Sequence, residues 1–106
     1  MIFENGEKKM NDEQLMEYML DVLREFYQQN SVQMRQIGEI RDALERRTNE
    51  KIRLDQITRC GIQLAGRGFI RIEAYRGQHP LPGWVDAIIL QDGISHIQSR
   101  TGAEVS

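Results

Sequence analysis

The sequence predicts a single α+β domain made of three helices, a β-hairpin and a short final helix. Apolar residues recur at helical spacing in three segments between residues 11 and 68, and then alternate with polar residues from residue 69 onward. Residues 76–83 contain two prolines and two glycines, and they interrupt the alternation as a turn does. The chain of 106 residues is long enough for one domain with its own core.

The first predicted helix covers residues 11–30. Asn11 can cap its start, and Gln14 stands at the position that completes a capping box. Its apolar residues form two neighbouring stripes, a wide face that a small domain need not cover completely. The stripes are Leu15, Met19, Val22 and Phe26, and Met16, Leu20, Leu23 and Tyr27. Packing in the core explains most of this face, and we also expect a homodimer with its contact at Met16, Leu20, Leu23 and Tyr27.

The second predicted helix begins at Met34 and ends near Asn49. Its apolar side is spaced by three or four residues, and its other side is charged. Gly38 weakens this helix by about 1 kcal/mol relative to alanine.

The third predicted helix covers residues 54–68. Asp55 is a candidate N-cap, and Gly68 can take the left-handed conformation that ends a helix. Gly61 lies on the inner side, where a glycine suggests the close approach of another backbone. The inner side comprises Leu54, Ile57, Gly61 and Leu64, and the outer side comprises Asp55, Thr58, Arg59, Ile62 and Gly66, flanked by Gln56 and Gln63.

Two strands and a short helix follow. Residues 69–77 and 84–93 form a predicted hairpin with a long tip, and residues 92–100 form a predicted final helix. We expect residues 1–10 to be a flexible N-terminal leader, residues 11–100 to be the domain, and residues 101–106 to be a flexible tail.

The charge is distributed unevenly, although the net charge is only -2. Residues 31–76 contain ten basic and six acidic residues, a net charge of +4, whereas both flanking segments are negative. Such asymmetry can mark a face that binds anions. It is equally compatible with mixed charges that solvate helix faces.

The end of the third helix carries a resemblance to a known superfamily. Leu64 is followed by three variable residues, then by Gly68 and the apolar pair Phe69 and Ile70, and Ile57 stands seven residues before Leu64. With the order of elements, this pattern resembles the winged helix-turn-helix superfamily over roughly residues 12–98. The stretch AIILQDGISHI is similar to the exit from the wing into the next helix, although Gln91 stands where a serine or threonine cap is usual.

The resemblance implies that the third helix enters the major groove of double-stranded DNA. Side chains of the outer face would then reach bases, since Arg can bind guanine and Gln can bind adenine in a bidentate way. Lys51 and Arg53 would lie near phosphates, and the wing tip offers Arg76, Gln78 and His79. The predicted DNA-binding residues are Lys51, Arg53, Gln56, Thr58, Arg59, Gln63 and Arg76.

We therefore interpret the chain as a small DNA-binding transcriptional regulator of bacterial or phage type. Ile62 and Asp55 on the outer face do not favour DNA, and the wing tip has no basic cluster. A winged-helix protein-interaction module without DNA binding is the alternative, using the first helix or the face around Ile62. A structural domain with no nucleic-acid role is the third possibility.

Other classes of function have little support in the sequence. Cys60 lies on the inward half of a helix, where an inert thiol is usual, and neither His79 nor His96 has a metal-ligand partner at the required spacing. We expect no enzyme activity, no metal and no cofactor. One cysteine excludes an internal disulfide, and neither a signal peptide nor an apolar run of about 18 residues is present. We expect a cytoplasmic protein without a membrane partner.

Overall fold

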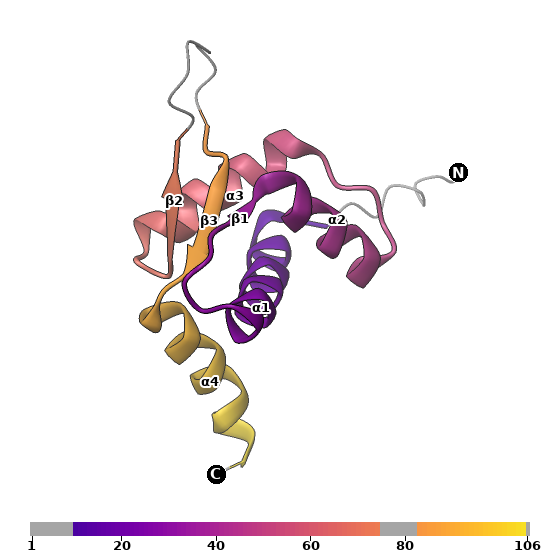
Figure 1. The fold of residues 1–106 in the computed structure, drawn as a ribbon. Helices are drawn as coiled ribbons and strands as arrows, with labels where there is room; N and C mark the ends of the chain where they lie inside the picture. The colour runs from indigo at the N-terminus through magenta and orange to yellow at the C-terminus, as the bar shows by residue number, and fades with distance from the viewer. Residues whose placement is uncertain (1–9, 75–82, 106) are drawn as a thin grey trace, which may run out of the picture.

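The computed structural model describes residues 10–74 and 83–105, with side chains as far as Arg100. Within these residues the fold is α+β, as predicted, with four helices and a small three-stranded antiparallel sheet (Figure 1). The elements are α1 (Asp12–Gln29), β1 (Arg35–Gln36), α2 (Ile37–Thr48), α3 (Leu54–Gly66), β2 (Ile70–Glu73), β3 (Asp86–Ile89) and α4 (Gln91–Val105).

Helix α1 starts with the predicted capping box. The side-chain oxygen of Asn11 accepts the Gln14 N–H at 2.8 Å, and the Gln14 side chain accepts the Asn11 N–H at 3.3 Å. These bonds satisfy two donors that a helix start otherwise leaves without a partner. Helix α1 contacts α2, α3, α4 and β3, and is therefore the central element of the fold.

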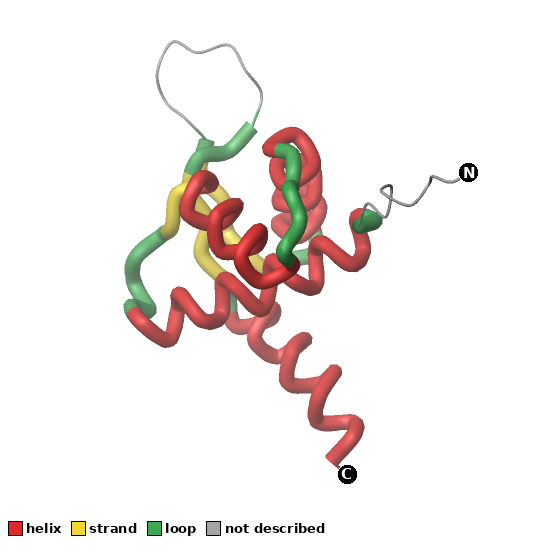
Figure 2. The backbone as a smooth tube through the Cα atoms, turned by 90° about the vertical axis from the view of Figure 1, so that its right-hand side faces the viewer, coloured by secondary structure: helices red, strands yellow, loops and turns green. Residues whose placement is uncertain are grey.

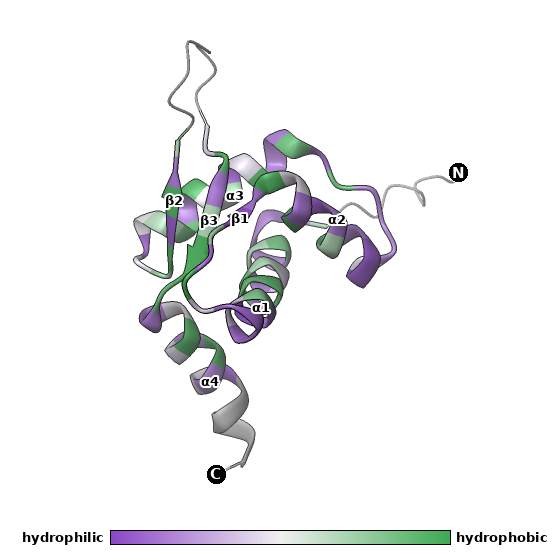
Figure 3. Cartoon of the chain, viewed as in Figure 1, coloured by the Kyte–Doolittle hydropathy of each residue, from purple (hydrophilic) through white to green (hydrophobic). Residues whose placement is uncertain are grey.

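Both apolar stripes of α1 are used inside the chain. Met16, Leu20 and Leu23 are each about 1% exposed, and Tyr27 is half-buried against the same core. Figure 3 shows hydrophobic residues over much of α1 and along β3, in the middle of the fold. The surplus apolar face that led us to expect a dimer contact at these four residues is thus covered by the protein's own core.

Helix α2 begins three residues later than predicted. Arg35 and Gln36 form the short strand β1, which pairs with Ala87 and Asp86 of β3. The Ile37 N–H extends this pairing and donates to the Val85 carbonyl at 2.8 Å. A local helical pattern cannot reveal such a pairing, because the partner strand lies about fifty residues further along the chain.

The turn between α2 and α3 is held at both ends. Asn49 closes α2 in the left-handed conformation, with φ of 59°, which asparagine tolerates better than most residues. The Glu45 carboxylate then accepts the N–H of the buried Ile52 at 2.9 Å.

The N-cap of α3 is Arg53, so the prediction that Asp55 caps this helix is wrong. Leu54 is 42% exposed rather than inward, because it is the first residue of the helix.

Helix α3 ends in the way the sequence predicts. Gly68 has φ of +80°, its N–H donates to Ala65 at 3.0 Å, and the Phe69 N–H donates to Leu64 at 3.1 Å. This pair of bonds is a Schellman motif, with Gly68 in the left-handed position. It turns the chain sharply from α3 into β2.

Replacing Gly68 with valine is expected to lower the free energy of unfolding by more than about 1 kcal/mol, because a β-branched residue is strained at positive φ. Gly68→Asn is the matched control and should lose less, since asparagine visits this region more readily. Chemical denaturation measures both. Equal stability of the valine variant and the native protein would contradict the cap.

The sheet has the strand order β1-β3-β2. Strands β2 and β3 pair from Ile70 opposite Ile89 to Glu73 opposite Asp86, so they form the predicted hairpin. Helix α4 follows β3 after a single residue and contacts α1. Its C-terminal end extends away from the rest of the domain, as Figure 1 and Figure 2 show. It is longer than predicted and continues to Val105, beyond the expected end of the domain at residue 100.

Candidate functional site

Helix α3 has one side in the core and one side toward solvent, as its sequence predicts. Ile57, Cys60, Gly61 and Leu64 are buried. The opposite side exposes Asp55, Arg59, Ile62, Gln63 and Gly66. We call this exposed side of α3, with Thr58 at its edge, the outer face.

The hairpin is fixed beside α3 by Trp84. This side chain is 3% exposed, and its Nε1–H donates to the Thr58 carbonyl at 3.1 Å. The indole lies against Gly61, where an added Cβ would be 2.5 Å from Cε2 of the ring. Gly61 therefore permits a close approach, as predicted, but the neighbour is a side chain rather than a backbone. The role of Trp84 was missed, because nothing local in the sequence links residues 58 and 84.

Two predicted base-reading residues are held by the start of α1. The Arg59 guanidinium binds the Asp12 carboxylate with two hydrogen bonds, from Nε at 2.9 Å and from Nη2 at 3.0 Å. The Gln56 amide donates to the same carboxylate at 3.1 Å and to the Met10 carbonyl at 3.0 Å. Asp12 is a member of this site that the sequence did not reveal, since it stands 47 residues before Arg59.

These bonds favour the charged form of the Asp12 carboxylate. The hydrogen bond from Arg59, followed by that from Gln56, holds the pKa of Asp12 below its usual value of 3.8. The same hydrogen bond raises the pKa of Arg59. Both groups are therefore ionised throughout the neutral pH range.

Other arginines beside the outer face are also paired with acids. Arg53 binds Asp55 at 2.7 and 3.0 Å, and Arg67 lies 3.4 Å from the Glu13 carboxylate. Ion pairs thus engage three arginines around α3, Arg53, Arg59 and Arg67. All three pairs are open to solvent, so each contributes little to stability and is weakened by salt.

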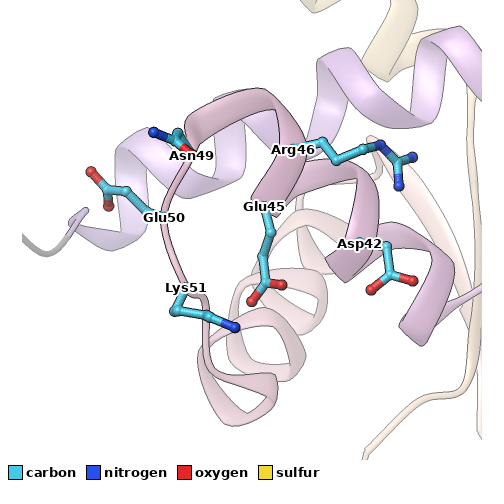
Figure 4. A pocket seen from close by; sticks show the side chains of 6 residues that line it. All are labelled: Asp42, Glu45, Arg46, Asn49, Glu50 and Lys51. Carbon is cyan, nitrogen blue, oxygen red and sulfur yellow. The ribbon is translucent and has the colours of Figure 1, made fainter.

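Lys51 stands in a different setting, on the turn before α3. It lines an open hollow of about 420 Å³ with Asp42, Glu45, Arg46, Asn49 and Glu50 (Figure 4). The hollow is polar and of mixed charge, whereas pockets for small molecules are enclosed and mostly apolar. The hollow lies at the turn between α2 and α3, and one of its lining residues, Glu45, accepts the Ile52 backbone N–H that holds this turn.

The remaining predicted DNA contacts lie in different settings. Gln63 is exposed on the outer face, and Thr58 is half-buried beside the hairpin. Arg76 lies outside the described residues, as do Gln78 and His79. The structure therefore brings Gln56, Thr58, Arg59 and Gln63 together on α3 and places Lys51 and Arg53 just before its start.

Cys60 is fully buried and contacts the Asp12 carbonyl at 3.8 Å. Burial, followed by the Asp12 charge, raises the pKa of its thiol to about 12. The thiolate that nucleophilic chemistry needs is therefore scarce at neutral pH.

His96 stacks on Phe69 and lies 3.1 Å from Glu17. Among the described residues no group of three His, Cys, Asp or Glu side chains has the geometry of a metal site.

Comparison of the chain with protein-family models, curated proteins and solved structures found no significant match. No helix in residues 10–74 and 83–105 has both the length and the apolar character needed to cross a bilayer.

Proposed function

We propose that this chain is a winged-helix DNA-binding protein that acts as a small transcriptional regulator. In this proposal α3 enters the major groove, and the β2–β3 hairpin is the wing beside it. The observation that carries the proposal is the presentation of α3: its outer face is exposed and mostly polar, and Trp84 fixes the hairpin against the same helix. A rigid helix with a polar exposed side is what direct reading of base edges requires.

The exposed residues have distinct roles in this arrangement. Arg59 and Gln63 project from the outer face and, with the half-buried Gln56 and Thr58, are the residues proposed to reach base edges. Lys51, on the turn before α3, is proposed to contact the phosphate backbone, which sets affinity rather than sequence preference. Arg53 stands next to it, although its guanidinium is engaged by Asp55 in the free protein.

The two roles predict different effects of substitution. Lys51→Ala should weaken binding to all duplex sequences alike and reduce the slope of log K against log salt by about one unit. Arg59→Ala should weaken binding to the preferred sequence about tenfold or more and relax the preference at one base position. The measurement is a titration of duplex DNA from the native gene neighbourhood at two salt concentrations.

Arg100→Gln is the matched control for loss of a basic residue, because Arg100 is bound to Glu17 and Asp21 on the α1–α4 side. It should change neither the salt slope nor the base preference. If no duplex binds the native protein more tightly than the nonspecific range of ~10⁻⁴–10⁻⁶ M, the proposal of a specific regulator is wrong.

The second candidate is a protein-interaction module. It is favoured by Ile62, which is 51% exposed in the middle of the outer face, and by the pairing of Arg53, Arg59 and Arg67 with acids. An apolar centre with a neutralised rim suits a protein partner better than a polyanion. Ile62→Ala discriminates between the two without adding charge: a protein partner loses an apolar contact and binds more weakly, whereas the charge-dependent affinity for DNA phosphates is unchanged.

A further inference from the structure

We propose that Asp12 is an autoinhibitory carboxylate, which occupies the DNA-reading side chains of α3 until nucleic acid displaces it. The inference rests on the proposed function and concerns the regulation of the same site. It does not concern the fold, because the first turn of α1 is held independently by the capping box of Asn11 and Gln14.

In its geometry, the Asp12 carboxylate takes the place that a phosphate or a base edge would take against Arg59. Arg59 uses Nε and Nη2 to grip the two oxygens of one carboxylate. This is the same bidentate mode in which a guanidinium holds a phosphate or the O6 and N7 atoms of guanine. One oxygen also accepts the Gln56 amide, a donor that adenine recognition requires. A single anionic group therefore occupies two reading side chains together.

The contact is open to solvent and can be displaced by a competing ligand. The Arg59 side chain is 53% exposed and the Asp12 side chain 32% exposed, so solvent screens the pair. The Asp12 carboxylate is ionised at neutral pH, and the hydrogen bond from Arg59, which lowers its pKa, favours this charged form further. Two parallel hydrogen bonds fix the orientation of the guanidinium against the carboxylate.

Glu13 offers a matched control for Asp12. The two residues are neighbours in the first turn of α1, and both carry one negative charge at the positive end of the helix dipole. The Glu13 carboxylate contacts Arg67 at 3.4 Å and has no bond to Arg59 or Gln56 among the described contacts. Asp12→Ala and Glu13→Ala therefore remove equal charge from the same turn, and only the first releases Arg59.

The experiment compares duplex-DNA dissociation constants of the native protein and the two variants, and follows the Arg59 Nε–H signal by NMR. Asp12→Ala should bind DNA more tightly than Glu13→Ala by up to about five-fold, the range expected for an exposed ion pair. The Arg59 signal should move in Asp12→Ala, stay in place in Glu13→Ala, and move in the native protein when DNA is added.

Two other outcomes overturn the inference in distinguishable ways. Equal DNA affinity of the two variants, with an Arg59 signal that DNA does not move, rejects the autoinhibitory contact but leaves the proposed function standing. Absence of duplex binding by the native protein and both variants rejects the proposed function, and the autoinhibitory role with it.

Discussion

Gly61→Ala is expected to lower the free energy of unfolding by about 3 kcal/mol and to move Trp84 out of its buried position. A Cβ at residue 61 would lie 2.5 Å from Cε2 and 2.6 Å from Cζ2 of the indole, closer than packed carbon atoms can approach. Either the ring or α3 must move. Both movements break the hydrogen bond between the Trp84 Nε1–H and the Thr58 carbonyl.

Trp84 is the only tryptophan in the sequence, so fluorescence reports this displacement directly. The emission of the folded Gly61→Ala variant should shift to longer wavelength as the indole becomes exposed. Gly66→Ala is the control in the same helix, because nothing lies within 4 Å of a Cβ added there. It should retain the native emission and be at least as stable as the native protein. If the two variants behave alike, the close packing of Trp84 against Gly61 is incorrect.

The local features of the fold are those that the sequence could predict. The capping box at Asn11 and Gln14, the buried side of α3 and the left-handed Gly68 each depend on residues within one or two helical turns. Propensity and periodicity act over that range. The hairpin was predictable for the same reason, since its strands are consecutive and a stretch rich in glycine and proline separates them.

The features that escaped prediction depend on contacts between distant residues. Strand β1 has only two residues, and its existence depends on β3. Asp55 has the right chemistry for a helix cap, but the helix begins one residue before it, and Arg53 takes its carboxylate. The apolar stripes of α1 are evident from the sequence, but their burial within one chain depends on how the other elements cover them.

The candidate site also has features that the sequence predicts and features that depend on distant residues. The direction in which Arg59 and Gln63 point follows from helical geometry and was predictable. Their electrostatic setting was not, because Asp12 and Glu13 come from another helix. The net charge of +4 in residues 31–76 suggested a positive surface, yet three of its arginines beside α3 are paired with acids. Charge counted along a sequence is therefore a weak guide to the potential of a face.

The junction between β2 and α4 carries the second large expected effect. Gly93 is buried in the first turn of α4, and a Cβ added there would lie within 3.0 Å of the Phe69 carbonyl oxygen and 2.8 Å from Ile89 Cγ1. The Phe69 carbonyl also accepts the Leu90 N–H at 2.9 Å, a bond that connects the start of β2 to the start of α4. Unlike the Trp84 ring, a backbone carbonyl cannot rotate away from an intruding methyl group.

Gly93→Ala is therefore expected to destabilise the protein by about 3 kcal/mol or more, a large fraction of the stability of a domain of this size. Gly38→Ala is the matched control near the start of α2, where nothing lies within 4 Å, and alanine there should stabilise the helix by roughly 1 kcal/mol. Urea denaturation gives both values, and hydrogen exchange at the Leu90 amide reports the connecting bond. Faster exchange of that amide in Gly93→Ala is expected, because α4 must withdraw from Phe69 to accommodate the methyl group. Unchanged stability with a protected Leu90 amide would show that Gly93 does not pack closely against the Phe69 carbonyl.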